Sequence, residues 1–142
     1  MSFKIVEMMK QKASKLSPET RGYAAYGFIV PGREGFIMPA FVIQWLEKSG
    51  LPCFLVYHDF DTDSYGRAKP MHYHVMVLYD ALKTAAPVFD LCKAVGGHGL
   101  EAISSPHAYA RYLCHLDNPD KYQYSLKEVM CINGCVYEEF IK

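Results

Sequence analysis

The order of strand-forming and helix-forming stretches is the feature of this 142-residue chain that most restricts its fold. Runs rich in β-branched and aromatic residues predict four strands, at 23–30, 51–57, 71–79 and 100–104. Apolar residues at helical spacing predict one helix from Ala40 to Ser49 and a second that includes Val88 and Val95, each followed by glycine. The resulting order, βαββαβ, is that of an α+β protein with a ferredoxin-like core, in which a central antiparallel sheet carries the helices on one face. We expect the other face to stay open and to hold any active site.

Capping residues sharpen two helix boundaries. Thr84 is expected to cap the second helix. Ser105 followed by Pro106 predicts the start of a further helix, which should run to about His115 before the sequence at 117–119 breaks it.

Composition indicates a single domain, since 51% hydrophobic residues in a chain of this length suffice for one core. We expect an N-terminal arm or helix at 1–20, a domain at 21–125, and at 126–142 a C-terminal extension that packs on the domain or begins a further region. Five cysteines without a Cys-x-x-Cys pair are expected to be reduced thiols. Cys114, Cys131 and Cys135 match no zinc-finger spacing.

The charge is balanced, with 15 Lys and Arg against 15 Asp and Glu, so gross charge alone argues against a nucleic-acid or membrane partner. The most apolar region, 36–46, is far shorter than the roughly 20 residues that a membrane span needs. We therefore expect a soluble protein of the cytoplasm.

Two histidines lie in the third predicted strand, and because side chains alternate along a strand, His72 and His74 project from one face. His58 and Asp61 follow the preceding strand and reach the same face if the two strands pair. Three imidazoles and a carboxylate suit a divalent first-row ion. The mixed nitrogen and oxygen donors would accept Mn²⁺ or Mg²⁺ at a functional site and are also compatible with Zn²⁺ or Co²⁺. A His-x-His pair alone is more often a hydrogen-bonded surface pair, so His58 and Asp61 are what favour a metal.

Tyr109, Tyr112 and His115 follow one another at three-residue spacing, so they share one face of the last predicted helix. Aromatic residues at this spacing commonly belong to a core. A phenol, with an ordinary pKa of about 10, is a weak nucleophile unless a base or cation assists it. A metal-polarised phosphate beside an imidazole supplies that assistance.

Three stretches carry a resemblance to a known family and occur in that family's order: YHDFD at 57–61, KPMHYHV at 69–75 and ARYLCHLDNPDKYQY at 110–124. His72-Tyr73-His74 resembles the motif of the HUH endonucleases. More narrowly, residues 23–125 resemble the nuclease and origin-binding domain of replication initiator (Rep) proteins from rolling-circle plasmids of Gram-positive bacteria.

The resemblance implies a ligand set for a divalent metal, Mn²⁺ or Mg²⁺, consisting of His58, Asp61, His72 and His74. It implies that the chain is a bacterial, metal-dependent endonuclease and strand transferase. In that family a tyrosine attacks a phosphate of single-stranded DNA at an origin hairpin. The products are a 5′-phosphotyrosine link and a free 3′-OH that primes rolling-circle replication by the host machinery, and full-length members commonly oligomerise.

Tyr112 is the implied nucleophile, because it opens the matching run in the third stretch. Tyr109 is then a packing or base-stacking residue. Many HUH replication proteins carry lysine three residues after the nucleophile, where this chain has His115, so His115 is an accessory candidate for proton transfer or phosphate contact.

An enzyme that handles single-stranded DNA needs local cations and aromatic surfaces rather than an overall positive charge. The stretch 65–69 offers both just before the His-x-His strand, and two cations flank Tyr112 in sequence. The candidates for DNA contact are Tyr65, Arg67, Lys69, Arg111 and Lys121. Each is equally compatible with an ordinary solvated surface residue.

Three other functions remain open at this point. A conjugative relaxase or transposase of the same superfamily uses the same residues, although relaxases often place the tyrosine before the histidine pair. A non-catalytic DNA-binding module would carry a degenerate site, whereas all five expected residues are present here. A zinc hydrolase could use the same three histidines and aspartate.

Overall fold

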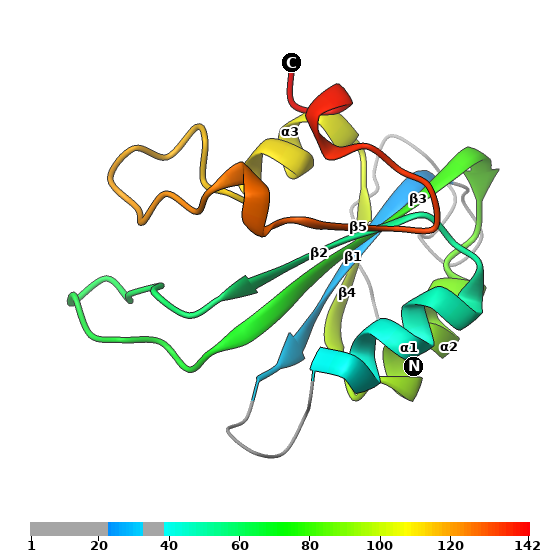
Figure 1. The fold of residues 1–142 in the computed structure, drawn as a ribbon, viewed down its shortest axis with the longest axis horizontal. Helices are drawn as coiled ribbons and strands as arrows, with labels where there is room; N and C mark the ends of the chain where they lie inside the picture. The colour runs from blue at the N-terminus through cyan, green and yellow to red at the C-terminus, as the bar shows by residue number, and fades with distance from the viewer. Residues whose placement is uncertain (1–22, 33–38) are drawn as a thin grey trace, which may run out of the picture.

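The computed structural model describes residues 23–32 and 39–142, which build one antiparallel sheet with helices on both faces (Figure 1). The strand order is β4-β1-β3-β2-β5. The strands are β1 (Tyr23–Pro31), β2 (Cys53–His58), β3 (His72–Lys83), β4 (His98–Ile103) and β5 (Met130–Ile132). The helices are α1 (Pro39–Ser49), α2 (Ala86–Ala94) and α3 (Pro106–Tyr112), with 3₁₀ turns at Leu126–Glu128 and Tyr137–Glu139.

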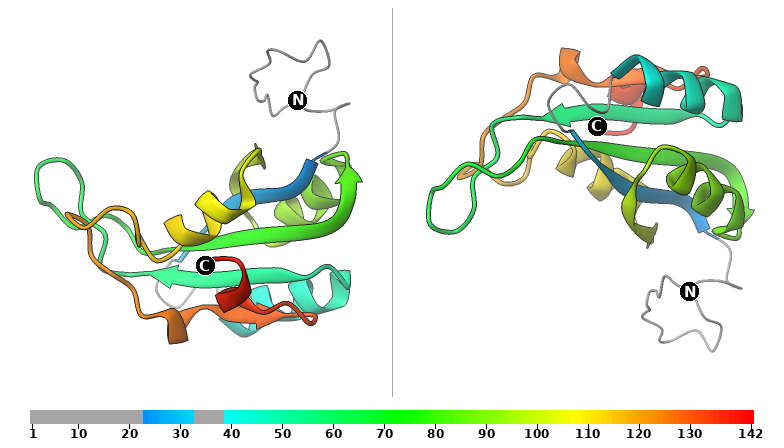
Figure 2. Two further views of the ribbon diagram at one scale, coloured as in Figure 1. Left: turned by 90° about the horizontal axis from the view of Figure 1, so that it is seen from above. Right: turned by 90° about the horizontal axis from the view of Figure 1, so that it is seen from below.

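The first four strands and two helices confirm the α+β, ferredoxin-like βαββαβ prediction. Helices α1 and α2 lie on one face of the sheet, whereas α3 and residues 126–142 lie on the other (Figures 1 and 2). The second face is thus covered over part of its area, contrary to the expectation that it stays open. The reason is that apolar side chains such as Phe54 and Met76 point to this face and need burial, which Ala110 and Tyr137 provide.

Two helix boundaries differ from those expected. The cap expected at Thr84 is wrong, because Ala85 holds the N-cap position of α2 without a side-chain hydrogen bond, and Pro87 in the first turn removes one backbone donor. Helix α3 ends at Tyr112 rather than at His115, whose φ of +60° takes the chain out of the helix. Ser105 does cap α3, since its Oγ accepts from the amide of Ala108 at 3.3 Å. The arm expected at 1–20 lies outside the described residues.

Alternation along β3 divides the core into two layers. Tyr73, Val75 and Val77 face α1 and α2, while Met76 and Leu78 face α3 and the C-terminal segment. By the same alternation, the two histidines at the start of β3 face the α3 side. The hydrophobic pattern of this strand therefore decides which face of the sheet can carry the site.

Gly27 in the centre of β1 permits the close approach of α3 to the sheet. A Cβ atom at this position would lie 2.5 Å from Oη and 2.7 Å from Cζ of Tyr109. Both atoms belong to a rigid ring that is itself packed beneath the helix, so neither can move aside cheaply. The missing side chain sets the distance between β1 and α3.

We predict that Gly27→Ala destabilises the protein by about 1–3 kcal/mol through overpacking. The urea midpoint of unfolding measures this loss. Tyr109→Leu in the same chain should recover part of it, because it removes the ring that the added methyl meets. Additive losses in the double variant would contradict the proposed contact.

Candidate active site

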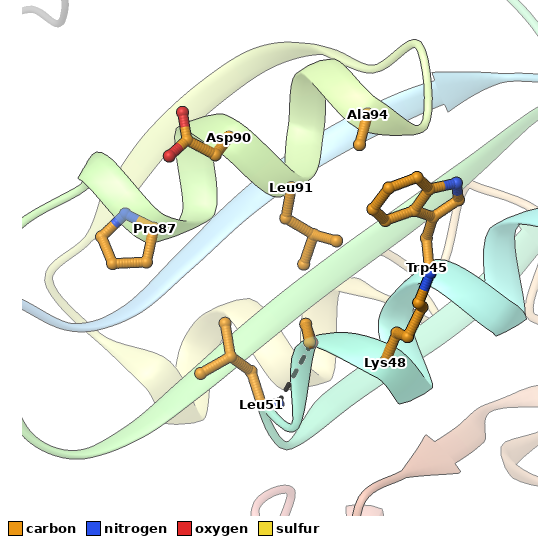
Figure 3. Close-up of a pocket in the computed structure, with 8 residues that line it drawn as sticks. Trp45, Lys48, Leu51, Pro87, Asp90, Leu91 and Ala94 are labelled. Carbon is orange, nitrogen blue, oxygen red and sulfur yellow. Dashed lines mark hydrogen bonds between the residues drawn. The ribbon is translucent and has the colours of Figure 1, made fainter.

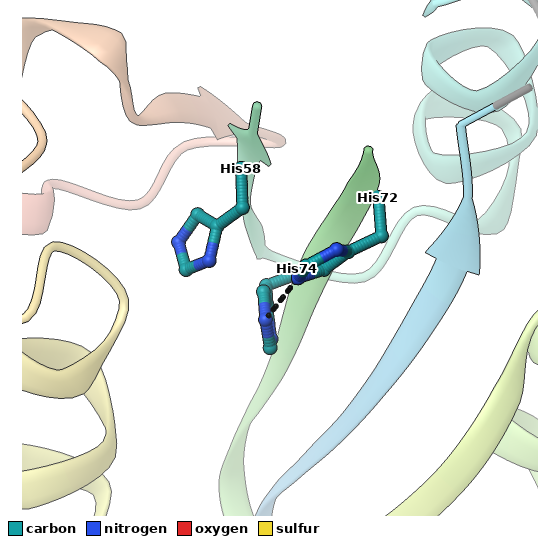
Figure 4. Close-up of side chains that lie close together, drawn as sticks. All are labelled: His58, His72 and His74. Carbon is teal, nitrogen blue, oxygen red and sulfur yellow. Dashed lines mark hydrogen bonds between the residues drawn. The ribbon is translucent and has the colours of Figure 1, made fainter. Parts of the chain in front are cut away.

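Three histidines meet where β2 and β3 pair. His58, at the end of β2, stands directly opposite His72 in the antiparallel register, and His74 follows two residues along β3 on the same face. The ring of His58 lies 5.4 Å from that of His72 and 4.3 Å from that of His74, between centroids. One ring nitrogen from each of the three lies within 4.8 Å of the others (Figure 4).

Backbone carbonyls set the tautomers of two of these rings. The Nε2–H of His58 donates to the carbonyl oxygen of Leu113 at 2.7 Å, just after α3. The Nδ1–H of His72 donates to the carbonyl oxygen of Pro70 at 2.9 Å. The opposite nitrogen of each neutral ring, Nδ1 of His58 and Nε2 of His72, therefore carries a lone pair.

These lone pairs point at a carboxylate. Asp61 Oδ2 lies 3.1 Å from His58 Nδ1 and 3.5 Å from His72 Nε2, and His72 Nε2 lies 3.2 Å from His74 Nε2. Electron pairs that converge at these distances repel one another unless a proton or a cation lies between them. His74 Nδ1 is buried without a hydrogen-bond partner, whereas its Nε2 lies within hydrogen-bonding distance of the His72 lone pair and can donate to it when no cation is bound. The donor set and its crowding fit a divalent cation held by nitrogen and oxygen ligands.

The protonation states agree with a cation site. Burial lowers the pKa of His58, against the raising effect of the Leu113 carbonyl and Asp61. Burial, together with His58 and His72, lowers the pKa of His74 to about 3. Burial alone would raise the pKa of Asp61, but the hydrogen bond from Tyr124 and the nearby His58 outweigh it and hold that pKa below its ordinary value. At neutral pH these groups are thus a carboxylate and neutral imidazoles, the forms that bind metals.

Tyr124, the last residue of the third matching stretch, contacts two members of this cluster, a role that was not predicted for it. Its hydroxyl donates to Asp61 Oδ1 at 2.6 Å and accepts from the amide of Phe60 at 3.0 Å. Its ring stacks on that of His58, with centroids 4.3 Å apart and planes 4° apart. Tyr124 therefore orients a carboxylate and an imidazole at once, as outer residues do around metal ligands.

Tyr112, the last residue of α3, stands beside the histidines. Its ring centroid lies 5.7 Å from that of His74 and 5.6 Å from that of His115. Burial, then Asp61 and Glu101, raise the pKa of its phenol, so the resting side chain is protonated. Tyr109 lies one turn earlier against Gly27, away from the histidines.

His115 is the fourth imidazole of this region. It is buried, its ring lies 4.9 Å from that of His58, and its Nδ1–H donates to the carbonyl of Tyr122 at 2.8 Å. In the neutral ring the Nε2 lone pair is then left for the site. Ligand atoms of His115, His58 and Asp61 lie within 4.8 Å of one another, so His115 belongs to the cluster more closely than sequence alone suggested.

The five residues expected to contact DNA differ in position. Lys69 and Lys121 are exposed beside Tyr112, and Lys121 Nζ lies 5.8 Å from the centroid of the Tyr112 ring. Tyr65 and Arg67 stack on each other in the exposed loop after β2. The Arg111 guanidinium is bound by the Asp117 carboxylate and the Ile141 carbonyl, so it links α3 to the segment that follows it and to the C-terminal segment.

Clefts of different character lie on the two faces of the sheet. On the α3 side, a cleft of about 340 Å³ is bounded by Pro31, Asp61, His72, His74 and Tyr112, among others. This volume lies in the range of ligand sites, roughly 300–1,000 Å³. On the opposite side, a cleft between α1 and α2 is lined mainly by apolar residues such as Trp45, Leu51 and Leu91 (Figure 3). Chemistry therefore concentrates on the α3 side.

Comparison with known families agrees with this geometry. Residues 30–138 match the family described as the plasmid replication protein, origin binding domain. The chain belongs to this family. It is 29% identical over 85 residues to a replication protein of Staphylococcus aureus, covering 60% of this chain and 43% of that protein. It is 32% identical over 77 residues to the replication protein RepB of Lactiplantibacillus plantarum, covering 54% of this chain and 35% of that protein.

The resemblance to Rep proteins is thereby confirmed, and the family description names a replication origin. The matches span less than half the length of these two relatives. Among the described helices, none combines the length and apolar character that a membrane crossing requires.

We predict that the metal-free protein loses stability as pH falls below 6.5. Unfolded histidines bind protons near pH 6.5, whereas buried His74 does so only near pH 3, so the unfolded state gains protons first. The loss contributed by His74 is about 2 kcal/mol at pH 5, and His58 adds to it. Urea midpoints at pH 7.5 and 5 in the presence of chelator measure the effect.

His74→Asn should show a smaller change between the two pH values, because asparagine cannot charge. His107→Gln, a change of an exposed histidine on α3, serves as the control and should behave as the unmodified chain does. An equal change of the urea midpoint with pH in all three proteins would contradict the assignment of this change to His74.

Proposed function

We propose that this domain nicks and rejoins single-stranded DNA at a plasmid replication origin, with Tyr112 as the nucleophile and a divalent metal, Mn²⁺ or Mg²⁺, held by His58, Asp61, His72 and His74. The observation that carries the proposal is the position of a half-buried tyrosine beside a cluster of three imidazoles and a carboxylate. The family description, which names a replication origin, supports the choice of substrate. The protein would act in the bacterial cytoplasm with the host replication machinery.

The ligand residues are prepared for a cation before it arrives. Leu113 and Pro70 carbonyls turn the lone pairs of His58 and His72 inward, and Tyr124 fixes Asp61. When bound there, a divalent cation supplies a Lewis acid for an oxygen of the scissile phosphate. Because the three histidines lie on paired strands and Tyr124 holds Asp61, little rearrangement is needed on binding.

Tyr112 performs the covalent step. Its phenol oxygen forms a bond to phosphorus, the bond from phosphorus to the 3′ oxygen breaks, and that oxygen leaves as a 3′-OH after taking up a proton. The phenol gives up its own proton, and the Nε2 atom of His115 is the neighbouring acceptor that is not assigned to the metal. The phosphodiester energy is kept in the tyrosyl ester, so attack by a 3′-OH reverses the reaction and rejoins the strand.

The surface charge suits local binding of a single DNA strand better than nonspecific coating of duplex DNA. The chain has formal charge zero, but Lys69 and Lys121 line a small recess of about 30 Å³ together with Tyr112. Two local cations can hold phosphates on either side of a reacting one without a large global field. This resolves the apparent conflict between the balanced composition and a nucleic-acid partner.

A covalent-capture experiment tests the nucleophile. We expect a denaturant-stable protein–DNA adduct when the chain is mixed with Mn²⁺ and a randomised single-stranded library. Tyr112→Phe should abolish the adduct, and Tyr109→Phe, which alters the neighbouring tyrosine on α3, should retain it. Sequencing the captured strands gives the site. An adduct that persists in Tyr112→Phe, or the absence of an adduct with the unmodified chain, would contradict the proposal.

A second prediction concerns Tyr124. Tyr124→Phe removes the hydrogen bond to Asp61 and should weaken Mn²⁺ binding about 10- to 100-fold, the usual effect of losing an outer partner of a metal ligand. Calorimetric titration of the chelator-treated protein measures this. The matched control is Tyr26→Phe, which removes a buried hydroxyl bonded to the Lys83 carbonyl on β3. Equal Mn²⁺ affinity in both variants would refute the positioning role.

A further inference from the structure

Phe60 and Tyr122 form an exposed aromatic pair next to the candidate active site. Their side chains are 58% and 46% exposed, and the rings stack with centroids 4.8 Å apart and planes 28° apart. Phe60 comes from the loop after β2, while Tyr122 comes from the segment after α3, so the fold brings the two together from distant parts of the sequence. We call this pair the aromatic platform.

The platform is the outer end of a continuous row of rings. Tyr122 meets Tyr124 edge-on with centroids 4.7 Å apart, and Tyr124 stacks on His58. The backbone amide of Phe60 donates to the Tyr124 hydroxyl. Since Tyr124 and His58 are buried, the platform is anchored to the same residues that orient the metal ligands. The contacts of Phe60 and of Tyr122 with Tyr124 therefore fix the position of the platform relative to the site.

The surface beside the platform carries cations next to aromatic rings. Tyr122 and Tyr112 line one small recess of about 30 Å³, together with Lys69, Lys121 and others. A cationic groove next to exposed rings is how proteins hold single strands, with lysines on phosphates and aromatic faces on bases.

We propose that the Phe60–Tyr122 platform stacks on a nucleobase that lies within a few nucleotides of the scissile phosphate. Phe60 ends the row of rings and is its most exposed member, so a base placed on it continues the stack. Because every base has an aromatic face, this contact holds the strand in register and reads no sequence. The inference rests on the proposed function, since it takes single-stranded DNA as the substrate.

Binding to two strands of equal charge tests the platform without any nicking. The probes are a 20-nucleotide oligothymidylate and a 20-unit abasic strand, and the protein is the full chain carrying Tyr112→Phe. Fluorescence anisotropy at low salt in chelator gives both affinities. We expect the chain to prefer the thymidylate strand by about fivefold to a hundredfold, the range for one stacked base.

The double variant Phe60→Leu with Tyr122→Leu should lose most of that preference while it keeps its affinity for the abasic strand. Tyr122→Phe keeps a ring and should retain the preference. Phe41→Leu is the matched control, because Phe41 is 46% exposed but lies on α1, on the opposite face of the sheet. An undiminished preference in the double variant would overturn the proposal, as would no preference, or no binding to either strand, in the parent chain.

The two proposals fail in different ways. If no adduct forms with Mn²⁺ but the thymidylate preference still depends on the platform, the nicking function fails and the base contact stands. If the adduct forms and the double variant keeps its preference, the platform fails and the nicking function stands. A series of captured strands, each with one abasic position, then locates the stacked base. The parent chain should bind one of them more weakly, with the abasic position near the nick, whereas the double variant should bind that strand and the intact strand equally.

Discussion

The pairing of β2 with β3 is the constraint on which the site depends. In the observed register His58 stands opposite His72, and the alternation of side chains places His74 on the same face. A slip of one residue would send the paired histidines to opposite faces of the sheet. The slip is opposed by the alternation of buried side chains along both strands, since it would also move either Leu55 of β2, or Val75 and Val77 of β3, out of the layer under α1 and α2. The core thus enforces the geometry of the polar cluster.

Helix α3 is joined to this cluster by backbone rather than by side chains alone. The carbonyl of Leu113, one residue after Tyr112, accepts the hydrogen bond from His58. Gly27 sets the distance between the same helix and the sheet through its contact with Tyr109. His58, a candidate metal ligand, and the candidate nucleophile are therefore held at a fixed separation by two independent contacts, one polar and one steric.

Much of this arrangement could be predicted from local pattern. Alternation placed His72 and His74 on one face, and helical spacing placed Tyr112 near the end of a helix. Tyr124 escaped prediction because residues 113–125 have no periodicity, and its partners His58, Phe60 and Asp61 lie more than 60 positions away in sequence. The three-residue strand β5 is too short to give a pattern, and the left-handed backbone of His115 has no signature in a non-glycine residue. Long-range contacts and the left-handed conformation of a single residue were the features that could not be predicted from the sequence.

The end of the described chain is fastened directly to the helix that carries Tyr112. Arg111 donates to the carbonyl of Ile141 at 2.6 Å, and the Tyr137 hydroxyl donates to the carbonyl of Ala110. Ala110 and Arg111, two positions and one position before the candidate nucleophile, are thus bonded to residues 137–141. This segment is therefore part of the packing that holds α3, and Tyr112 with it, against the sheet.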